Sequence, residues 1–501
     1  MKTQLFIHWS ALALAAVVTT SLHAAVELNP LFSDGAVLQR GQPVPVWGTA
    51  RDGEQVTVEF DDQKVNTTAA DGKWSVNLKP LKEGGPFTMT ITGDNAVTVN
   101  NLLVGEVWLC SGQSNMHFRM SGVENSKREI AAANHPALRF FNVPQQMEQS
   151  PATALQGAWK TISPETAGQC SAVAYYFGRD LQKKLGVPVG LIISSVGGTR
   201  IESWMRAETL AATGESAAMV KKWSEVSPEE FKRINTDYSV FQHQRDDVHP
   251  RAVKAAKTQG LPISPPPVAP KIRTHDCPSA LHNGMIAPLQ PFAIRGAIWY
   301  QGESNSGLPA PYQKLLPAMI GDWRKVWGKE LPFLFVQLAP HRNTRPAFRE
   351  AQQRIWQSTP LTAMAVTTDV GNANDIHPTR KEPVGQRLAL AARALTYGEK
   401  LEYSGPLYDS MIVKSGKIIL SFKHVGGGLI AKDGELKGFT IAGDDKNFIP
   451  AKAEIQGATL IVSAEGVTNP QAVRYGWANF PEVNLFNREG LPASPFRTDA
   501  D

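Results

Sequence analysis

The chain has 501 residues, of which 42% are hydrophobic and 19% are charged, a composition typical of folded proteins with two or three domains. Its formal net charge of +5 is spread along the sequence rather than gathered in basic runs, which argues against binding to nucleic acid or to a membrane surface. Three cysteines are too few for a disulfide scaffold, and their spacing is not that of a metal site.

Residues 1–24 have the features of an export signal. Lys2 gives a positive start, an apolar stretch covers 11–18, and the segment ends on the small residue Ala24. The alternative is an N-terminal anchor helix, but the apolar run is short for a bilayer span, and no later segment is a candidate. We therefore expect cleavage near Ala24 and a periplasmic or extracellular protein without membrane insertion.

The cysteines have two expected environments. Cys110 lies in an apolar run and is predicted to be a packed core residue. In an oxidising compartment a Cys170–Cys277 bridge is possible, although sequence alone cannot establish the pairing.

Residues 25–103 have the pattern of a small all-β unit. Runs such as Q-V-T-V-E-F and K-W-S-V-N-L alternate apolar and polar residues at period two, and turn sequences such as A-D-G-K separate them. Several short strands at this spacing predict an immunoglobulin-like β-sandwich.

Residues 104–398 have a different pattern. Nearly continuous apolar runs, such as V-P-V-G-L-I-I-S-S and L-P-F-L-F-V-Q-L, are typical of parallel strands covered on both faces. They alternate with predicted helices over 172–185, 312–327 and 380–397, so we expect an α/β/α sandwich. Residues 206–270 are rich in charge and end in a proline-rich loop, which indicates an insertion.

From residue 399 to 501 strand-like runs return. K-I-I-L-S-F and A-T-L-I-V-S-A are separated by glycine-rich turns, and they predict a second β region at the C-terminus.

A serine at the start of a predicted helix is the first candidate for catalysis. In V-W-L-C-S-G-Q-S-N-M, a predicted strand leads to Gly112 and then to Ser114. Open α/β folds place their sites at this carboxyl edge of the sheet, and the N–H groups of a following helix would stabilise an anion there. Ser111 precedes the glycine and is expected to pack or to cap the turn. The alternative for Ser114 is a helix cap without catalytic function.

A serine nucleophile needs a base, and the base needs an orienting partner. His377 follows the predicted strand over 361–369 and therefore lies at the same edge, with Asp375 two residues earlier. Such a carboxylate can fix the tautomer of the ring. The alternative is a capping Asp375 beside a surface histidine. His117, three residues after Ser114, is expected as a substrate contact or a polar surface residue.

Two further strand ends carry groups that could stabilise an oxyanion. The run I-I-S-S-V-G-G-T-R supplies the backbone N–H groups of Gly197 and Gly198, and W-Y-Q-G-E-S-N supplies the side-chain amides of Gln301 and Asn305. The alternatives are a tight turn for the glycines and loop capping for the amides.

Taken together, these motifs resemble the SGNH-hydrolase superfamily and, within it, the sialate O-acetylesterase family. The matching segments are G-Q-S-N-M at 112–116, G-G-T-R-I-E-S-W at 197–204, H-N-G-M-I-A-P-L at 282–289, W-Y-Q-G-E-S-N at 299–305 and D-I-H-P at 375–378. They cover about residues 104–395, and the flanking β regions are similar to that family through weaker motifs. W-Y-Q-G-E-S-N is the specific signal among them.

The resemblance implies an oxyanion hole around the nucleophile Ser114. The backbone N–H of Ser114 and that of Gly198, or of its neighbour Gly197, would donate to the oxyanion. An amide side chain would complete the hole, and Gln301 is favoured over Asn305 for this role.

The resemblance also implies that His377 is the base. The last block of the family normally has an aspartate three residues before the histidine, where this chain has Asn374. Asp375 is therefore taken as the acid member, with Asp369 or a backbone carbonyl as the alternatives.

The implied activity is that of an exported carbohydrate O-acetylesterase that needs no metal or organic cofactor. Its substrate would be an acetylated sugar of the sialate 9-O-acetyl type, or acetylated xylan or another plant polysaccharide. Sialic acid requires a cation for its carboxylate, and Arg200 and Arg380 lie in the matching motifs. Glu303 and Trp299 are the other candidate substrate contacts.

Two other functions compete with this one. A glycosidase would use two carboxylates, and Glu303 and Asp375 are the obvious pair. A non-catalytic sugar-binding protein would use Trp204, Trp299 and Tyr300 as stacking platforms, although aromatic residues at strand ends more often pack in the core.

Overall fold

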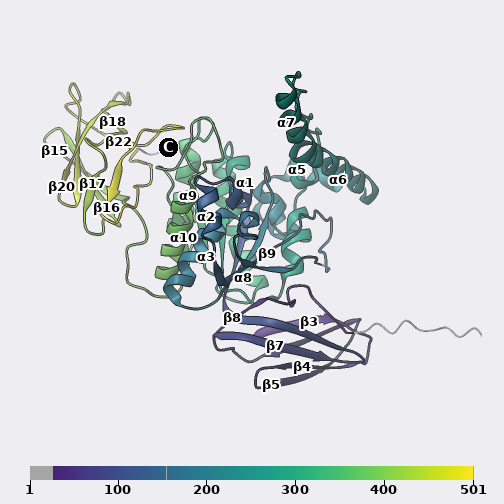
Figure 1. Ribbon diagram of the computed structural model, residues 1–501. Coiled ribbons are helices and arrows are strands. Elements are labelled where there is room, and N and C mark those ends of the chain that lie inside the picture. Colours follow the sequence, from purple (N-terminus) through teal and green to yellow (C-terminus); the bar gives the residue numbers. More distant parts are fainter. Residues whose placement is uncertain (1–25, 154, 500–501) are drawn as a thin grey trace, which may run out of the picture.

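The computed structural model describes residues 26–153 and 155–499. The expected export segment, 1–24, lies outside the described residues. Figure 1 shows three parts: an all-β region at the N-terminal end, a central region of helices around a sheet, and a second all-β region at the C-terminal end. Within the described ranges, no helix combines the length and the apolar character needed to cross a membrane.

The N-terminal region consists of two sheets, with strand orders β1-β3-β6 and β2-β8-β7-β4-β5. Its strands are β1 (Glu27–Leu28), β2 (Val37–Gln39), β3 (Val44–Thr49), β4 (Gln55–Phe60), β5 (Gln63–Thr68), β6 (Lys73–Leu78), β7 (Gly84–Thr92) and the first part of β8 (Ala96–Gly112). The period-two runs are confirmed as strands. In β4, for example, Val56, Val58 and Phe60 are buried, whereas the residues between them are not.

Strand β8 continues from this region into the central sheet, where the order is β10-β9-β11-β8-β12-β13-β14. The added strands are β9 (His135–Asn142), β10 (Trp159–Ile162), β11 (Val189–Ser195), β12 (Gly296–Tyr300), β13 (Phe333–Val336) and β14 (Thr362–Ala365). All neighbours are parallel except the antiparallel pair β9–β10, so the sheet is mixed. The two strands of that pair were not predicted, because β9 carries a proline and an arginine and β10 is short.

Helices cover both faces of the central sheet (Figure 1). They include α3 (Ala172–Leu185) and α10 (Glu382–Leu395) on one face, and α8 (Pro309–Val326) and α9 (Pro346–Ser358) on the other. Trp108 of β8 packs on Phe177 of α3 with ring centroids 5.1 Å apart, and Trp299 of β12 packs on Trp323 of α8 at 6.0 Å. The predicted helix over 172–185 has the observed bounds, and the other two differ by a few residues at their ends.

The charge-rich segment is helical and stands away from the sheet (Figure 1). Its helices are α4 (Ala207–Thr213), α5 (Ala217–Ser224), α6 (Pro228–His243) and α7 (His249–Gln259). The sequence indicated an insertion here but not its secondary structure.

The C-terminal region contains three antiparallel sheets, with orders β15-β16-β21-β20, β17-β23 and β19-β18-β22-β24. Its strands are β15 (Leu407–Lys414), β16 (Lys417–Lys423), β17 (Leu429–Ala431), β18 (Phe439–Ala442), β19 (Ile449–Pro450), β20 (Lys452–Gln456), β21 (Thr459–Ser463), β22 (Ala472–Tyr475), β23 (Leu485–Asn487) and β24 (Phe496–Arg497). This region has a hydrophobic core of its own, whereas the N-terminal and central regions share one.

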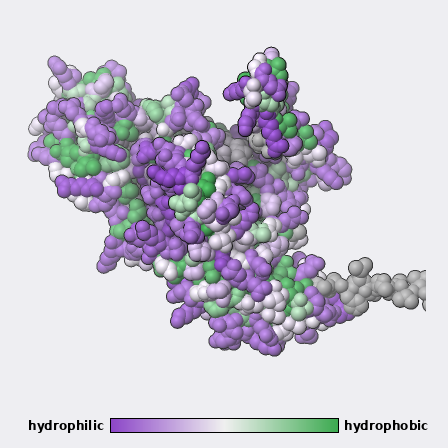
Figure 2. Space-filling model, viewed as in Figure 1, coloured by the Kyte–Doolittle hydropathy of each residue, from purple (hydrophilic) through white to green (hydrophobic). Residues whose placement is uncertain are grey.

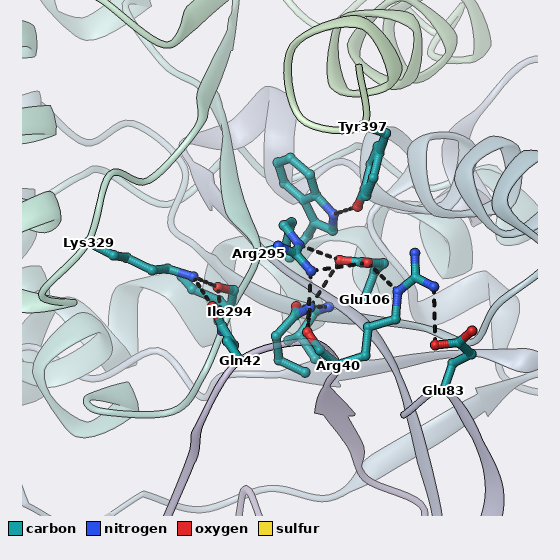
Figure 3. Close-up of polar contacts among 11 residues, drawn as sticks. Arg40, Gln42, Glu83, Glu106, Ile294, Arg295, Lys329 and Tyr397 are labelled. Carbon is teal, nitrogen blue, oxygen red and sulfur yellow. Dashed lines mark hydrogen bonds and ion pairs between the residues drawn. The ribbon is translucent and has the colours of Figure 1, made fainter. Parts of the chain in front are cut away.

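A buried carboxylate joins the N-terminal and central regions (Figure 3). Glu106 of β8 is fully buried, and it accepts hydrogen bonds from Arg40 Nε at 2.6 Å, Arg295 Nε at 2.7 Å and Gln39 Nε2 at 3.0 Å. Arg40 also pairs with the exposed Glu83 at 3.4 Å. Several charged donors are what a buried carboxylate requires, so this cluster fixes β2 and the start of β12 around β8.

All three cysteines are buried and free, so the Cys170–Cys277 bridge that the sequence allowed is not formed. Burial raises the pKa of the Cys110 thiol well above its ordinary value. Cys110 is a core residue, as predicted. On the face seen in Figure 2, hydrophilic residues predominate and apolar residues form small separate groups.

Candidate active site

The carboxyl ends of three central strands meet at one edge of the sheet. In the parallel register, Gly112 at the end of β8 lies opposite Ser195 of β11 and Tyr300 of β12. The turns that follow these strands therefore come together, as expected for a site in an open α/β sheet. The backbone also links them, because the N–H of Val196 donates to the carbonyl of Gly112.

Ser114 and Ser111 have different environments. Gly112 has a φ of +136°, and a Cβ at that position would lie 2.2 Å from the carbonyl oxygen of Tyr300, so only glycine fits the turn. The short helix α1 (Ser114–His117) then begins at Ser114, which is half-buried and lines a cleft. Ser111 is fully buried within β8, where it can only pack.

His377 lines the same cleft as Ser114, although the two residues come from distant parts of the chain. Its ring Nδ1 lies 3.5 Å from Oδ1 of Asp375, which also accepts a hydrogen bond of 2.8 Å from the backbone N–H of His377. Burial lowers the pKa of His377, and the nearby Asp375 charge partly opposes this shift. Asp369 is held instead by Arg387 in a two-point ion pair at 2.7 and 2.8 Å, so Asp375 is the carboxylate beside the histidine.

Of the two glycines after β11, Gly197 approaches the serine closely. A Cβ added at Gly197 would lie 3.3 Å from the Cβ of Ser114, and Gly198 has a φ of +77°. Behind Gly198, the ring of His275 is buried and stands edge-on to that of Tyr238, with centroids 4.6 Å apart. Burial lowers the pKa of His275 to about 3, so this ring is neutral.

The two side-chain amides expected in the oxyanion hole donate hydrogen bonds to other groups in the protein interior. Nε2 of Gln301 donates to the carbonyl of Thr199 at 3.1 Å and to Oδ1 of Asn305 at 2.8 Å. Nδ2 of Asn305 donates to Glu202 at 3.0 Å. Neither residue is among the described residues that line the cleft. The structure therefore does not bring Gln301 or Asn305 to the serine.

Gln113 is a cleft residue that the sequence motifs did not single out. It is the residue before Ser114, it is 2% exposed, and it lines the cleft. Its backbone N–H donates to the carbonyl of Tyr300, which fixes its position beside the serine. The available signal was its place between Gly112, where only glycine fits, and Ser114, the predicted nucleophile.

The expected substrate contacts are only partly brought together. Glu303 lines the cleft, where its Oε1 accepts a hydrogen bond of 2.5 Å from Asn115. Trp299 is 1% exposed in the core between β12 and α8 and is not available for stacking. Arg200 and Arg380 are not among the described residues that line the cleft, and Arg380 donates to the backbone oxygen of Asp369 at 3.2 Å.

The aromatic platforms proposed for a sugar-binding protein are likewise core residues. Trp204 and Tyr300 are fully buried, and Trp204 packs edge-on against Trp299 at 5.9 Å. They are therefore part of the hydrophobic core rather than of a surface.

The cleft has a volume of about 1200 Å³ and extends beyond the residues that surround Ser114. Part of its wall comes from the helical insertion and the loop after it, including Tyr238, Phe241, Gln242 and Arg273. His117 also lines it, and its Nδ1 lies 3.4 Å from the hydroxyl of Ser195. Among the described residues, no three His, Cys, Asp or Glu side chains are grouped as a metal site would require.

Known proteins resemble this chain over most of its length. The profile of a family described as carbohydrate esterase, sialic acid-specific acetylesterase, matches residues 104–236 and 277–394. Human and mouse sialate O-acetylesterases are each 30% identical to it, over 90% of this chain and 88% and 90% of theirs. The crystal structure of a carbohydrate acetylesterase from Xanthomonas citri, 37% identical, covers 95% of this chain and 100% of that one with a TM-score of 0.81.

Proposed function

The chain belongs to the family of sialic acid-specific acetylesterases, a group of carbohydrate esterases, and from this premise we propose that it deacetylates sugars through a serine–histidine acyl-enzyme mechanism. The family makes it a carboxylic ester hydrolase rather than the glycosidase or non-catalytic binding protein considered from sequence. The observation that carries the mechanism is the meeting of Ser114 and His377 in one cleft, with Gly197 against the serine. The central region would then be an SGNH-type fold.

In the proposed reaction, the hydroxyl oxygen of Ser114 attacks the acetyl carbonyl while His377 accepts its proton. The tetrahedral intermediate collapses as His377 protonates the departing sugar oxygen, which leaves an acetyl group on the serine. His377 then takes a proton from water, whose oxygen attacks the acetyl-enzyme. As acetate leaves, His377 returns this proton to the oxygen of Ser114. Asp375 keeps the ring oriented and stabilises the imidazolium.

Three donors would stabilise the oxyanion: the N–H groups of Ser114 and Gly198 and the side-chain amide of Gln113. The N–H of Ser114 has no partner within α1, because the first N–H groups of a helix never do. Gln113 replaces Gln301 in this proposal, since Gln113 lines the cleft and both amide hydrogens of Gln301 are engaged elsewhere. Removing one such donor reduces kcat by roughly 10²–10³-fold.

We propose an acetylated glycan of the sialate 9-O-acetyl type as the substrate, with a neutral acetylated polysaccharide such as xylan as the second candidate. The observation that favours the second is that neither Arg200 nor Arg380 is among the described cleft residues. The exposed Arg119 nevertheless lines the cleft, and it would supply the cation that the carboxylate of sialic acid requires. Both candidates fit a cleft of about 1200 Å³, which exceeds the usual range for small-molecule pockets.

The wall formed by α6 would contact the glycan beyond its acetyl group. Residues 237–276 lie between the two segments matched by the family profile, and they include Phe241, a half-buried aromatic residue that lines the cleft. Phe241→Ala should raise KM for an acetylated oligosaccharide and leave turnover of p-nitrophenyl acetate unchanged. Val240→Ala, on the same helix but 53% exposed, is the matched control. Equal effects on both esters would argue against glycan contacts here.

We also propose export, on the strength of the charged start, the apolar stretch and Ala24. Sequencing the N-terminus of the protein from its native host should find a start near Ala25.

The experiment that tests the proposed function is acetate release from acetylated sialic acid, xylan and pectin fragments by the wild type, Ser114→Ala and Ser111→Ala. Loss of the nucleophile should lower kcat by a factor on the order of 10⁶, as in other serine hydrolases. Ser111→Ala should stay active. If Ser111→Ala is inactive and Ser114→Ala is not, the assignment of the nucleophile is wrong.

A further inference from the structure

A buried polar cluster lies beneath the nucleophile and takes no part in the proposed chemistry. Asn115 and Lys381 are each 1% exposed. Nζ of Lys381 donates a hydrogen bond to Oδ1 of Asn115. Nδ2 of Asn115 in turn donates to Oε1 of Glu303 at 2.5 Å and to the backbone oxygen of Ile376 at 3.0 Å.

The members of this cluster come from the segments that carry the reacting groups. Asn115 is the residue after Ser114, and Ile376 is the residue before His377. A single amide therefore ties the helix of the nucleophile to the loop of the base. Glu303 brings the turn after β12 into the cluster, and Lys381 is the residue directly before α10.

Burying the charged side chain of Lys381 at this place costs free energy. Its ammonium lies 4.9 Å from the ring centre of Phe118 and 5.4 Å from that of Tyr300, and burial lowers its pKa to about 7. An apolar side chain of similar length would fill the space without removing a charge from water. What the ammonium adds is a donor that orients the amide of Asn115, so that its nitrogen points to Ile376 and Glu303.

We propose that Lys381, acting through Asn115, is a positioning residue that holds Ser114 at the correct distance from His377 for acyl transfer. The proposal rests on the proposed serine–histidine mechanism. It assigns Lys381 no contact with the substrate. Its effect is geometric, because a rotated or displaced Asn115 would release the link between α1 and the His377 loop.

The test compares Lys381→Met and Asn115→Asp with the wild type in turnover of p-nitrophenyl acetate. Met keeps the length of the side chain but cannot donate, and Asp keeps the shape of the amide but cannot donate to Ile376. Because small displacements of reacting groups reduce turnover steeply, each variant should lower kcat by about 10–100-fold. KM should change by less than about threefold, since the substrate contacts remain. The double variant should be no slower than about the slower single variant, because both changes break one link.

Lys329→Met is the control, because Lys329 is a half-buried lysine whose Nζ donates to Gln42 at 2.8 Å. In Figure 3 it lies beside the Glu106 cluster, and its Nζ also donates to the backbone oxygen of Ile294. Ile294 lies at the amino end of β12, away from the carboxyl edge of the sheet that carries Ser114, so the kcat of Lys329→Met should equal that of the wild type.

Circular dichroism identifies the variants that fold. If Lys381→Met does not fold, the kcat of Asn115→Asp tests the proposal. A folded variant of either kind with kcat within about twofold of the wild type overturns the proposal and leaves the esterase function standing. An equal loss in Lys329→Met overturns it as well. If the wild type itself neither turns over the ester nor reacts with a serine-directed phosphonate, the proposed function fails and the positioning role fails with it.

Discussion

Replacing Gly197 with alanine should slow the enzyme without unfolding it. The new Cβ would lie 3.3 Å from the Cβ of Ser114, closer than nine in ten Cβ contacts in proteins, so the serine must move away by a few tenths of an ångström. The φ of Gly197 is not in the left-handed region, and the backbone itself therefore accepts alanine. A misplacement of 1 Å can reduce turnover by 10²-fold, so a shift of this size should lower kcat by about tenfold.

The assay is acetate release under saturating substrate, with kcat and KM determined separately for Gly197→Ala. KM should be nearly unchanged, because the new methyl group meets the nucleophile rather than the sugar. Gly307→Ala is the control, since a Cβ at Gly307 meets no atom within 4 Å and its φ is not positive. A kcat for Gly197→Ala equal to that of Gly307→Ala would refute the reasoning, because the nucleophile would then not be the side chain that Gly197 approaches.

Other predictions concern stability and pH. Glu106→Gln leaves Arg40 and Arg295 facing each other without their shared carboxylate, and calorimetry should show a loss of stability of about 3 kcal/mol, while Glu83→Gln should leave the unfolding temperature almost unchanged. Because burial lowers the pKa of His377 and the base must be unprotonated, the acid limb of kcat/KM should lie below the ordinary value of about 6.5. Asp375→Asn removes a charge that raises the pKa of His377, so the acid limb should move to still lower pH. The accompanying loss in kcat should be much smaller than the roughly 10⁴-fold loss known for a buried triad aspartate, because the side chain of Asp375 is 57% exposed.

The sequence predicted the elements that have a local or periodic signature. The apolar runs of the central sheet and the helix over 172–185 are of this kind, and so is the meeting of the turns after β8, β11 and β12. Parallel strands place their carboxyl ends at one edge, so motifs that follow strands converge whatever their separation in the chain. This is why Ser114, Gly198 and His377 could be expected near one another.

The roles of individual amides could not be predicted in the same way. The direction of Gln301 depends on Asn305 and Thr199, and its oxygen accepts a hydrogen bond of 2.9 Å from Tyr312. The link between Asn115 and Lys381 joins residues 266 positions apart, and no spacing in the sequence signals it. Side-chain direction at a turn is set by such tertiary partners, and residue type alone leaves it open.

Tertiary packing also determines which aromatic residues are buried, and residue type alone does not show it. Trp299 begins the W-Y-Q-G-E-S-N motif, which made it a candidate substrate contact. Within β12, however, successive side chains point to opposite faces, and both faces of this sheet are covered by helices. Trp299 is consequently buried against Trp323 rather than exposed at the cleft.

Trapping the acyl-enzyme shows whether Ser114 becomes acetylated during turnover. The enzyme should be quenched in acid during turnover of an acetyl ester, digested, and analysed by fragmentation mass spectrometry, which separates Ser111 from Ser114 within one peptide. We expect an acetyl group on Ser114 in the wild type, and none in Ser114→Ala. An acetyl group on Ser111 or on another side chain, with Ser114 unmodified, would contradict it.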